Sequence, residues 1–412
     1  MMADKTKNKK ILILSSRDAA FEGRLYHLIA LNLKKAGFDI TILTSQREGQ
    51  PNEIANEDGI RIITFKKHPN KYIRKFHTLF SLFKKAKNLK PDIIHVTEVD
   101  AALYIGMKLK KYYQKRFGKK IKLVLESPEI WTHFYAAHVK NSFLRRLAIH
   151  IVMEWEHWMM KRHIDGVITA HELEKEYYNW QYPWIPVRKV MASVPLKDWG
   201  APPERTGEIT TFGTDGFFTL TRGMDVILGA IEILADEFPK LKYIAAGDMN
   251  EQMDRDYFKA WCDRTGLKDR VEWPGWVVRT DAVKYLDKMD IGIAASREDP
   301  HSNRIWPLNR IMYYFGRALP VLSTTRTTFS SQIIRDHEMG VITDDFSSEE
   351  LAKHLRIMIS NPEKTREMGK NAYKYAKAHF DVDDAIDQLL KLYRDIYTNK
   401  PYPIKSKITL RG

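Results

Sequence analysis

The chain has 412 residues, of which 44% are apolar and 29% charged, and its formal net charge is +15. This length exceeds what one hydrophobic core usually serves, so we expect two domains. The balance of apolar and charged residues excludes a disordered or fibrous chain. No apolar run approaches the roughly 18 residues of a membrane-spanning helix, and the first apolar run is too short for a signal peptide. The single cysteine, Cys262, is typical of a reducing compartment. These features together favour a cytoplasmic protein.

The positive charge is concentrated in one segment of the chain. Residues 66–122 contain seventeen Lys and Arg and three acidic residues, and residues 66–90 contain nine basic residues and no acid. Aromatic and aliphatic residues recur within 76–83 at near-helical spacing. Three interpretations stay open: a basic amphipathic surface that rests on anionic lipid at the inner face of a membrane, a nucleic-acid site, or a helix that packs its aromatic side chains on a sheet. No zinc knuckle, RNP-like strand or basic zipper accompanies the segment, so we expect no nucleic acid as a partner.

The first half alternates short apolar runs with amphipathic stretches. The expected helices are 24–38, closed by Gly37, then the basic stretch, about 101–114, and 142–162. The expected strands are 11–16, 39–45, 61–65, 91–96, 121–128 and 165–170. Continuous apolar strands separated by helices are typical of a parallel sheet that is covered on both faces.

A second alternating series follows a Pro- and Gly-rich linker at about 190–205. The expected strands are 209–216, 241–248, 271–276, 290–296, 320–324 and 340–343, and the expected helices are 224–238, 283–289, 309–317 and the segments from there to the end. The predicted fold class is therefore α/β, with two Rossmann-like doubly wound domains that face a central cleft. Ligands bind outside the carboxyl ends of the strands in such sheets, so the cleft is the expected site.

The helix at 309–317 combines an apolar face with a face of a different kind. Ile311, Met312 and Phe315 recur at helical spacing, which predicts that they pack against the core. The opposite face carries Trp306, Arg310, Tyr313 and Arg317. We expect this second face to be open and to look toward a bound ligand.

Several motifs of the chain resemble one enzyme family. The second-half motifs are "TRGMDVILGAIEILADEFPKLKYIAAGD", "VEWPGW", "YLDKMDIGIAAS" and "PLNRIMYYFGRALPV", and the first-half motifs are "LESPEIW", "MEWEHWMMKRHIDGVITA" and "VMASVP". In order and spacing they resemble family 4 glycosyltransferases, and the resemblance covers essentially the whole chain. It implies the GT-B type of fold. Residues 1–195 would form the acceptor-side domain, completed by the last helix at about 385–400, and residues 196–384 the nucleotide-sugar donor domain.

The resemblance also implies a reaction. Members of this family transfer a sugar from a nucleoside diphosphate sugar to an acceptor with retention of configuration. We therefore expect a hexosyltransferase-like enzyme of cell-envelope or polysaccharide biosynthesis, with a glycan or lipid-linked acceptor and without a metal or other cofactor. A diphosphate requires cations and backbone N–H groups close to it, and Arg222 and Arg310 stand where relatives place basic residues.

Further site residues follow from the same resemblance. The catalytic residues would be Glu298 and Glu129. The donor-binding residues would be Gly213, Arg222, Gly223, Ser302, Asn303, Arg310 and Tyr313. The acceptor-side residues would be Gly23, Glu126 and His133.

Several positions depart from the family pattern. Ile305 stands where relatives have a second Glu, which Glu298 in the preceding loop could replace, and the loop after the first strand has one glycine, Gly23, where relatives often have two. Tyr313 stands where relatives have a Glu that grips the ribose hydroxyls, and Pro128 stands where they have a His that contacts the donor sugar. A tyrosine hydroxyl can donate or accept a hydrogen bond, but it cannot chelate a diol as a carboxylate does. The alternative function is therefore that of a degenerate, catalytically weak member that binds nucleotide, sugar or a partner transferase.

Overall fold

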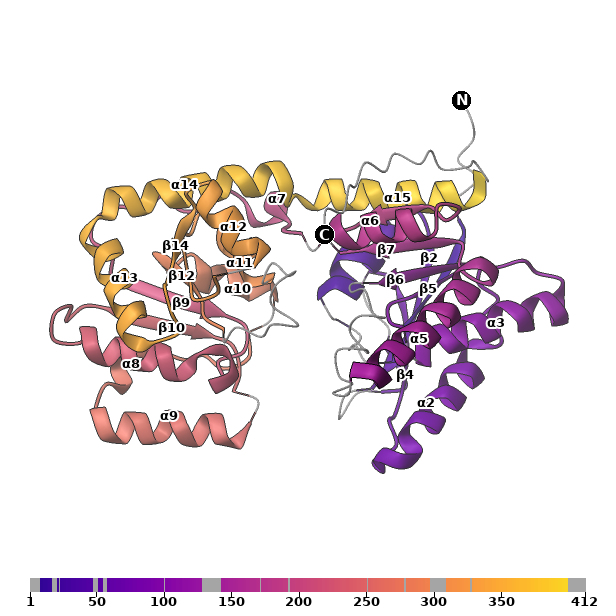
Figure 1. Ribbon diagram of the computed structural model, residues 1–412, viewed down its shortest axis with the longest axis horizontal. Helices are drawn as coiled ribbons and strands as arrows, with labels where there is room; N and C mark the ends of the chain where they lie inside the picture. Colours follow the sequence, from indigo (N-terminus) through magenta and orange to yellow (C-terminus); the bar gives the residue numbers. More distant parts are fainter. Residues whose placement is uncertain are drawn as a thin grey trace. The chain divides into compact units, whose positions relative to one another are not determined.

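A computed structural model of the protein describes residues 8–16, 21, 23–46, 51–54, 58–99, 101–127, 142–170, 172–191, 193–249, 251–277, 279–296, 309–326 and 328–398. The chain forms two compact units (Figure 1). The first unit comprises Met1–Ala192 and Asp383–Gly412, and the second comprises Ser193–Val382. Each unit has its own hydrophobic core. None of the described helices is long and apolar enough to cross a membrane.

The first unit is built on a sheet in which the described strands follow the order β3-β4-β2-β1-β5-β6-β7-β8. The strands are β1 (Lys10–Leu14), β2 (Asp39–Ser45), β3 (Glu53–Ile54), β4 (Arg61–Phe65), β5 (Ile93–Val96), β6 (Lys122–Ser127), β7 (Gly166–Thr169) and β8 (Val187–Lys189). All neighbouring strands pair in parallel except β3 and β4. The central strands are buried along nearly their whole length, as expected for a parallel sheet covered on both faces.

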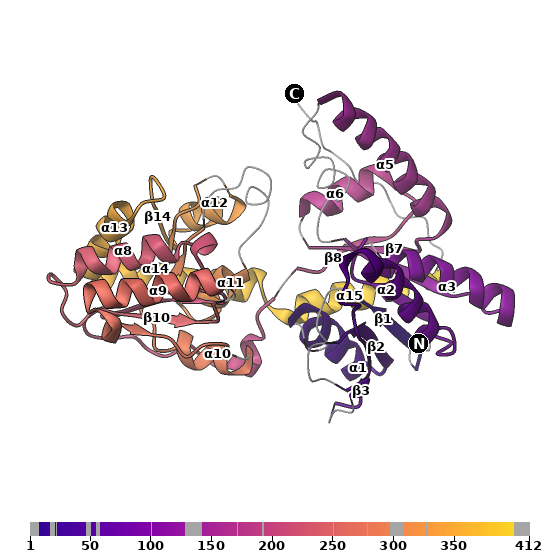
Figure 2. The same cartoon turned by 90° about the horizontal axis from the view of Figure 1, so that it is seen from below.

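Helices cover both faces of this first sheet. On one face the core includes residues of α2 (Lys71–Ala86), α3 (Ala101–Phe117), α5 (Ser142–Arg162) and α6 (Glu172–Gln181). The helices η1 (Gly23–Ala30), α1 (Leu31–Lys35) and α15 (Val382–Thr398) complete the unit. Figures 1 and 2 both show α15 beside the sheet. Gly166 of β7 makes this approach possible, because a Cβ atom at that position would lie 2.8 Å from Cγ2 of Ile396.

The second unit contains a parallel sheet in the order β11-β10-β9-β12-β13-β14. Its strands are β9 (Thr211–Asp215), β10 (Lys242–Ala246), β11 (Val271–Glu272), β12 (Ile291–Ala294), β13 (Val321–Ser323) and β14 (Gly340–Ile342). The helices α8 (Met224–Leu234), α9 (Gln252–Thr265) and α13 (Ser348–Ser360) pack on one face. The remaining helices are α7 (Leu196–Trp199), α10 (Arg279–Leu286), α11 (Asn309–Gly316), α12 (Phe329–Asp336) and α14 (Pro362–His379).

The structure differs from the sequence-based expectations in several helices, among them α6 and α7, which were not predicted. The segment expected as one helix over 24–38 begins as the π-helix η1 and ends at Lys35, because the chain turns at Gly37 with φ +93°. The helix expected over 283–289 begins four residues earlier and ends three residues earlier, at Arg279–Leu286. Helix α9 was not predicted, because its exposed charged residues dilute the apolar pattern; it is closed by Gly266, whose φ is +68°.

Candidate functional site

The loops that follow β9 and β10 are held together at the carboxyl edge of the second sheet. Gly216 follows β9 with φ +91°, and its N–H donates to the carbonyl of Ala246 at 3.0 Å. A Cβ atom at Gly247 would lie 1.7 Å from the carbonyl oxygen of Gly216, so the two backbones touch. Glycine at position 247 is therefore needed for this approach, which fixes the start of the loop that carries Arg222.

Arg222 and Gly223 connect this loop to α8. Arg222 ends the short 3₁₀ helix η2 (Leu220–Arg222), and Gly223 follows in the left-handed conformation with φ +79°. A Cβ atom at Gly223 would lie 2.8 Å from Cβ of Ala295, so both its conformation and its surroundings favour glycine. The Arg222 guanidinium lies over the ring of Phe217, 5.6 Å from the ring centroid. Arg222 is exposed at the carboxyl end of the sheet.

Arg310 approaches Arg222 from α11. Its side chain is only 6% exposed, and its Nη1 atom has no hydrogen-bond partner within the described part of the chain. The neighbouring Tyr314 hydroxyl donates to the carbonyl of Ile293 at 3.0 Å and accepts from the N–H of Asp215 at 3.0 Å. Tyr314 thereby links α11 to β12 and to the end of β9, which fixes the position of the Arg310 side chain beside it.

The two arginines make this edge of the sheet strongly cationic. Partial burial, followed by the positive charge of Arg310, lowers the pKa of Arg222, although an arginine remains protonated at neutral pH. Among the described residues, neither Arg222 nor Arg310 has a carboxylate partner. Two like charges close together, one of them buried, are costly unless an anion neutralises them. The arrangement is therefore a candidate anion site at the carboxyl ends of β9 and β12.

The expectation that α11 has an open polar face is wrong. Arg317 is 2% exposed. Its guanidinium makes two hydrogen bonds to the carboxylate of Asp287, at 2.7 and 2.9 Å. It also donates to the backbone carbonyls of Trp199, Gly200 and Ala201. Arg317 is thus a structural arginine that holds α7 and the end of α10 to the end of α11, and it does not look toward a ligand.

Tyr313 differs in the same way from the expected exposed position. Its side chain is half-buried, and its ring centroid lies 5.5 Å from that of Trp199 in an edge-to-face arrangement. The spacing along the helix predicted a common open face for Arg310, Tyr313 and Arg317, but the linker segment around α7 covers part of it. A donor-binding role for Tyr313 stays a prediction.

The remaining predicted donor-side residues divide into two groups. Gly213 lies within β9, where a Cβ atom would meet Cε of Met289 and the carbonyl of Ile244, both at 2.6 Å. Packing alone accounts for glycine at this position. Ser302 and Asn303 lie outside the described residues. The catalytic candidates Glu298 and Glu129, the acceptor-side candidate His133 and the departure Pro128 also lie outside them.

In the first unit, Glu126 is the centre of a buried polar network. It forms an ion pair with Arg24, which follows Gly23 at the start of η1. Its second oxygen lies 3.2 Å from Nε2 of His95, whose Nδ1 lies 2.8 Å from the Tyr393 hydroxyl. Burial acts to raise the pKa of Glu126, but the charge of Arg24 and the hydrogen bonds from His95 and Arg24 outweigh it and lower the pKa to about 2. The network joins η1, β5, β6 and α15 through an ionised carboxylate.

Sequence reasoning did not identify the aromatic residues near Arg222 and Arg310, nor the partners of Glu126. Phe217 and Trp276 lie beside the anion site, with ring centroids 6.0 Å apart. The pair Phe217 and Phe218, which directly follows the expected strand 209–216, was a usable signal for an aromatic loop. Arg24, His95 and Tyr393 carried no such signal, because they are distant in sequence and meet only in the folded unit.

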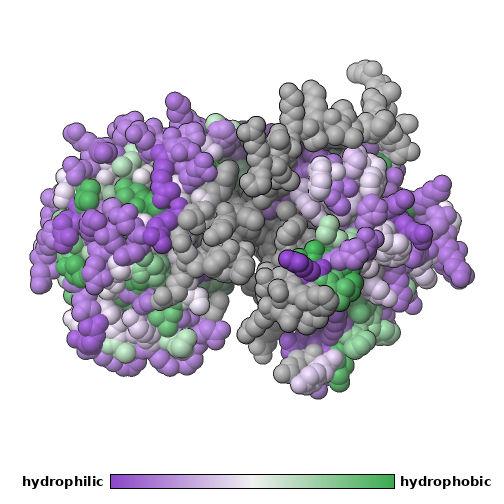
Figure 3. All heavy atoms as spheres, in the orientation of Figure 1, coloured by the Kyte–Doolittle hydropathy of each residue, from purple (hydrophilic) through white to green (hydrophobic). Residues whose placement is uncertain are grey.

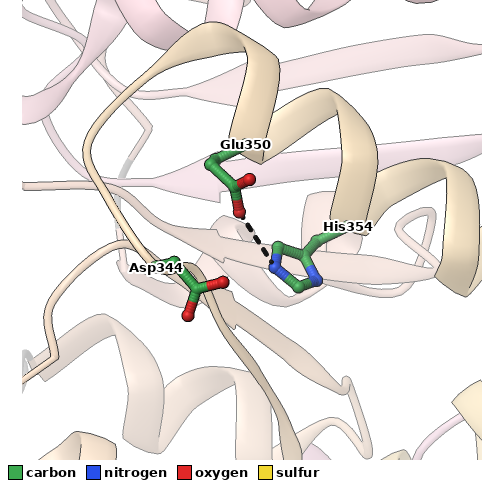
Figure 4. Close-up of side chains that lie close together, drawn as sticks. All are labelled: Asp344, Glu350 and His354. Atoms are coloured by element: carbon green, nitrogen blue, oxygen red, sulfur yellow. Dashed lines mark ion pairs between the residues drawn. The ribbon is translucent and has the colours of Figure 1, made fainter.

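A third cluster has the residue types of a metal site. Asp344, Glu350 and His354 have ligand atoms within 4.8 Å of one another (Figure 4). His354 forms an ion pair with Glu350 at 3.3 Å. Nζ of Lys353 lies 2.8 Å from Glu350 and 4.0 Å from Asp344. Because this ammonium already compensates both carboxylates, the group is best described as an ion-pair cluster at the start of α13.

Two domain models match the chain. Residues 212–375 match the family described as glycosyl transferases group 1, and residues 10–151 match glycosyl transferase 4-like domains. No curated protein sequence matches the chain at a significant level. These matches fall on the second and first units respectively.

Solved structures show the same fold. Sucrose-phosphate synthase from Thermosynechococcus elongatus has a TM-score of 0.70 at 17% identity, covering 95% of this chain and 100% of that one. The Anabaena protein HepE in complex with UDP-glucose has a TM-score of 0.64 at 15% identity, covering 94% and 99%. WaaG, a glycosyltransferase involved in lipopolysaccharide biosynthesis, has a TM-score of 0.65 at 15% identity, covering 95% and 100%. The chain therefore has two α/β parallel-sheet domains of the GT-B type, each of which matches a glycosyltransferase domain model, and the predicted fold class is confirmed.

Proposed function

We propose that this protein transfers a sugar, with retention of configuration, from a nucleoside diphosphate sugar to a glycan or lipid-linked acceptor in cell-envelope or polysaccharide biosynthesis. The observation that carries the proposal is the pair Arg222 and Arg310, two adjacent arginines without a carboxylate partner among the described residues. Negative charge grows on the diphosphate as the bond to the sugar breaks, and fixed cations at that point lower the barrier. The family models on both units and the UDP-glucose complex of HepE support the choice of donor.

The surroundings of the two arginines suggest how the rest of the donor is held. Phe217 packs between the Arg222 guanidinium and Trp276, and Trp276 is exposed. A flat, exposed aromatic ring next to a phosphate site is suited to stacking on a nucleobase. We assign the catalytic and sugar-orienting roles to Glu129, which the family resemblance retains, and to Glu298, which precedes Ile305, the position where relatives have a Glu.

A thermal-shift series with nucleoside diphosphates and their sugars tests the proposal. A ligand that binds the folded state raises the unfolding midpoint by mass action, so at least one donor should give a concentration-dependent shift. Incubation of that donor with lipid-linked acceptors, followed by mass spectrometry, then separates turnover from binding. A shift without any product would favour the degenerate binding protein, and no shift with any nucleotide would contradict both functions.

Replacing Arg222 by alanine should weaken nucleoside diphosphate binding by about 1.5–3 kcal/mol, the usual contribution of a hydrogen bond to a charged group. Binding of the same nucleoside without phosphates should change little. Calorimetric titration measures both affinities. Arg335→Ala, which removes an exposed arginine from α12 of the same unit, is the matched control. Equal losses for nucleoside and nucleoside diphosphate would show that the substitution disturbs the fold rather than a phosphate contact.

We also propose that the basic helix α2 rests on anionic lipid. The structure divides its apolar residues: Leu82 is buried, whereas Phe76 and Phe80 are 74% and 65% exposed. Figure 3 shows hydrophobic residues at the surface over this helix. The exposed side also carries Lys75 and Lys84. An amphipathic helix with exposed aromatics and flanking lysines is suited to the interface of an anionic membrane.

The double substitution Phe76→Ser/Phe80→Ser should reduce co-sedimentation with phosphatidylglycerol vesicles by at least about tenfold, because each buried aromatic ring contributes about 1.5–3 kcal/mol. Lys75→Glu/Lys84→Glu should also reduce co-sedimentation with these vesicles, and this reduction should be larger at low salt than at high salt. Met253→Ser/Tyr257→Ser on α9, where both side chains are likewise exposed, should have no effect. If the wild-type protein does not bind such vesicles at low salt, the membrane proposal is contradicted.

A further inference from the structure

A hollow of about 640 Å³ lies in the first unit, away from the Glu126 network. It is formed by the end of α3, the segment that leads into β6, and the end of α5. Lys122 is the first residue of β6, and Asp165 directly precedes β7. The hollow therefore lies at the amino ends of these parallel strands, whereas Glu126 lies near the carboxyl end of β6. We call it the basic hollow because of the residues that line it.

The charged residues that line the basic hollow are almost all cationic. Asp165 is the single carboxylate among its lining residues, and it is already bound by Lys110, by Lys122 at 3.3 Å and by the N–H of Leu123 at 2.8 Å. The cations are Lys110, Lys111, Lys115, Lys120, Lys122 and Arg162.

Most of this charge is not neutralised within the unit. Lys111, Lys115, Lys120 and Arg162 have no acidic partner in the part of the chain that the structure describes. Their mutual repulsion raises the local positive potential and attracts anions. The aliphatic stems of the lysines form the walls, so their ammonium groups can move onto a ligand.

His163 adds a buried ring nitrogen that has no hydrogen-bond partner among the described residues. Its side chain is 6% exposed, and its Nε2 atom forms no hydrogen bond to any described residue. Its ring packs edge-on against Trp158, at 5.1 Å between centroids. A buried polar atom without a partner is destabilising unless a ligand or a water molecule supplies one. Burial, followed by the charges of Lys111, Lys110 and Arg162, lowers the pKa of His163, and a bound anion would oppose the effect of those charges.

We propose that the basic hollow binds a compact anion that carries two or more phosphate groups. Its volume lies in the range of small-ligand sites. Six cations against one carboxylate suit a ligand with several negative charges better than a single carboxylate or sulfate. Lysine binds phosphate as a mobile point charge. The same chemistry is offered by a free polyphosphorylated metabolite and by a phosphorylated lipid headgroup. The site is independent of the sugar-donor site proposed for Arg222 and Arg310.

Titration with inorganic tripolyphosphate at low ionic strength tests the site. Lys115→Glu/Lys120→Glu should weaken binding by roughly tenfold or more, and both side chains are exposed, so the fold should be unaffected. The matched control, Lys364→Glu/Lys374→Glu, reverses two exposed lysines on α14 of the other unit and should bind as the wild type does. The Arg222→Ala variant should keep the tripolyphosphate binding that Lys115→Glu/Lys120→Glu removes, because that binding takes place outside the proposed donor site.

Three outcomes would overturn the proposal: no measurable binding, equal affinity in the wild type and the Lys115→Glu/Lys120→Glu variant, or an equal loss in the Lys364→Glu/Lys374→Glu control. A second measurement identifies the source of the anion. Vesicles of phosphatidylcholine with cardiolipin are sedimented with Phe76→Ser/Phe80→Ser protein, with and without the two hollow substitutions. A further loss of vesicle binding on substitution in the hollow supports a lipid headgroup. Unchanged vesicle binding, together with lost tripolyphosphate binding, supports a free anion.

Discussion

Replacement of Arg317 by leucine should lower the free energy of unfolding by about 3 kcal/mol. Arg317 is buried and forms hydrogen bonds to Asp287 and to three backbone carbonyls at the end of α7 and directly after it. Removing one partner of a buried ion pair costs about 3–5 kcal/mol. The lower end of this range applies because the Asp287 side chain is 32% exposed and water can solvate it. The change is measured from the urea-unfolding transition of the second unit.

Two comparisons make this prediction specific to the position of Arg317. Arg335→Leu removes an exposed arginine from α12 and should change stability by less than about 0.5 kcal/mol. Under conditions in which both units are folded, the Arg317→Leu variant should bind nucleoside diphosphates as the wild type does, because Arg317 points into the packing around α7. A selective loss of nucleotide affinity with unchanged stability would instead restore the ligand-facing role that the sequence predicted.

Substitution of Glu156 by glutamine should stabilise the protein by about 3 kcal/mol at pH 8.5 and leave its stability nearly unchanged at pH 4.5. Glu156 lies on α5 and is completely buried near Tyr182 of the first unit. Burial raises the pKa of its carboxyl from 4.5 to about 7, and the Tyr182 hydroxyl offsets only part of this effect. Glutamine has nearly the shape of the protonated carboxyl and, unlike a carboxyl, stays uncharged at every pH.

The sign of the effect follows from proton binding. Between pH 4.5 and 7 the folded state holds the Glu156 proton more tightly than the unfolded chain, so stability falls as the pH rises through this range. Above pH 7 the ionised Glu156 carboxylate destabilises the folded state to its full extent, and below pH 4.5 this destabilisation is absent. Glu154→Gln, two residues away and exposed, is the control and should show no such pH dependence. Urea unfolding at both pH values decides the question, and parallel curves for wild type and Glu156→Gln would contradict it.

The sequence by itself determined the architecture of this protein. Buried strands such as β1 and β12 are nearly continuous apolar runs, and such runs predict a parallel sheet because both faces must be covered. Repetition of that pattern after a Pro- and Gly-rich linker predicted two α/β domains. Arg222 was placed correctly in the loop after the first strand of the second sheet, because a strand followed by a Gly-containing loop and a helix is a local pattern.

Only the tertiary structure decided which arginines of α11 are available to a ligand. Helical spacing placed Arg310 and Arg317 on one face and predicted that both are open. Packing separates them: Arg317 binds Asp287 and the carbonyls after α7, whereas Nη1 of Arg310 is left without a partner among the described residues. Periodicity reports the direction of a side chain relative to its own helix, and it contains no information about which distant segment packs there. The Glu126 network and the basic hollow follow the same rule, because their residues meet only when the sheet is complete.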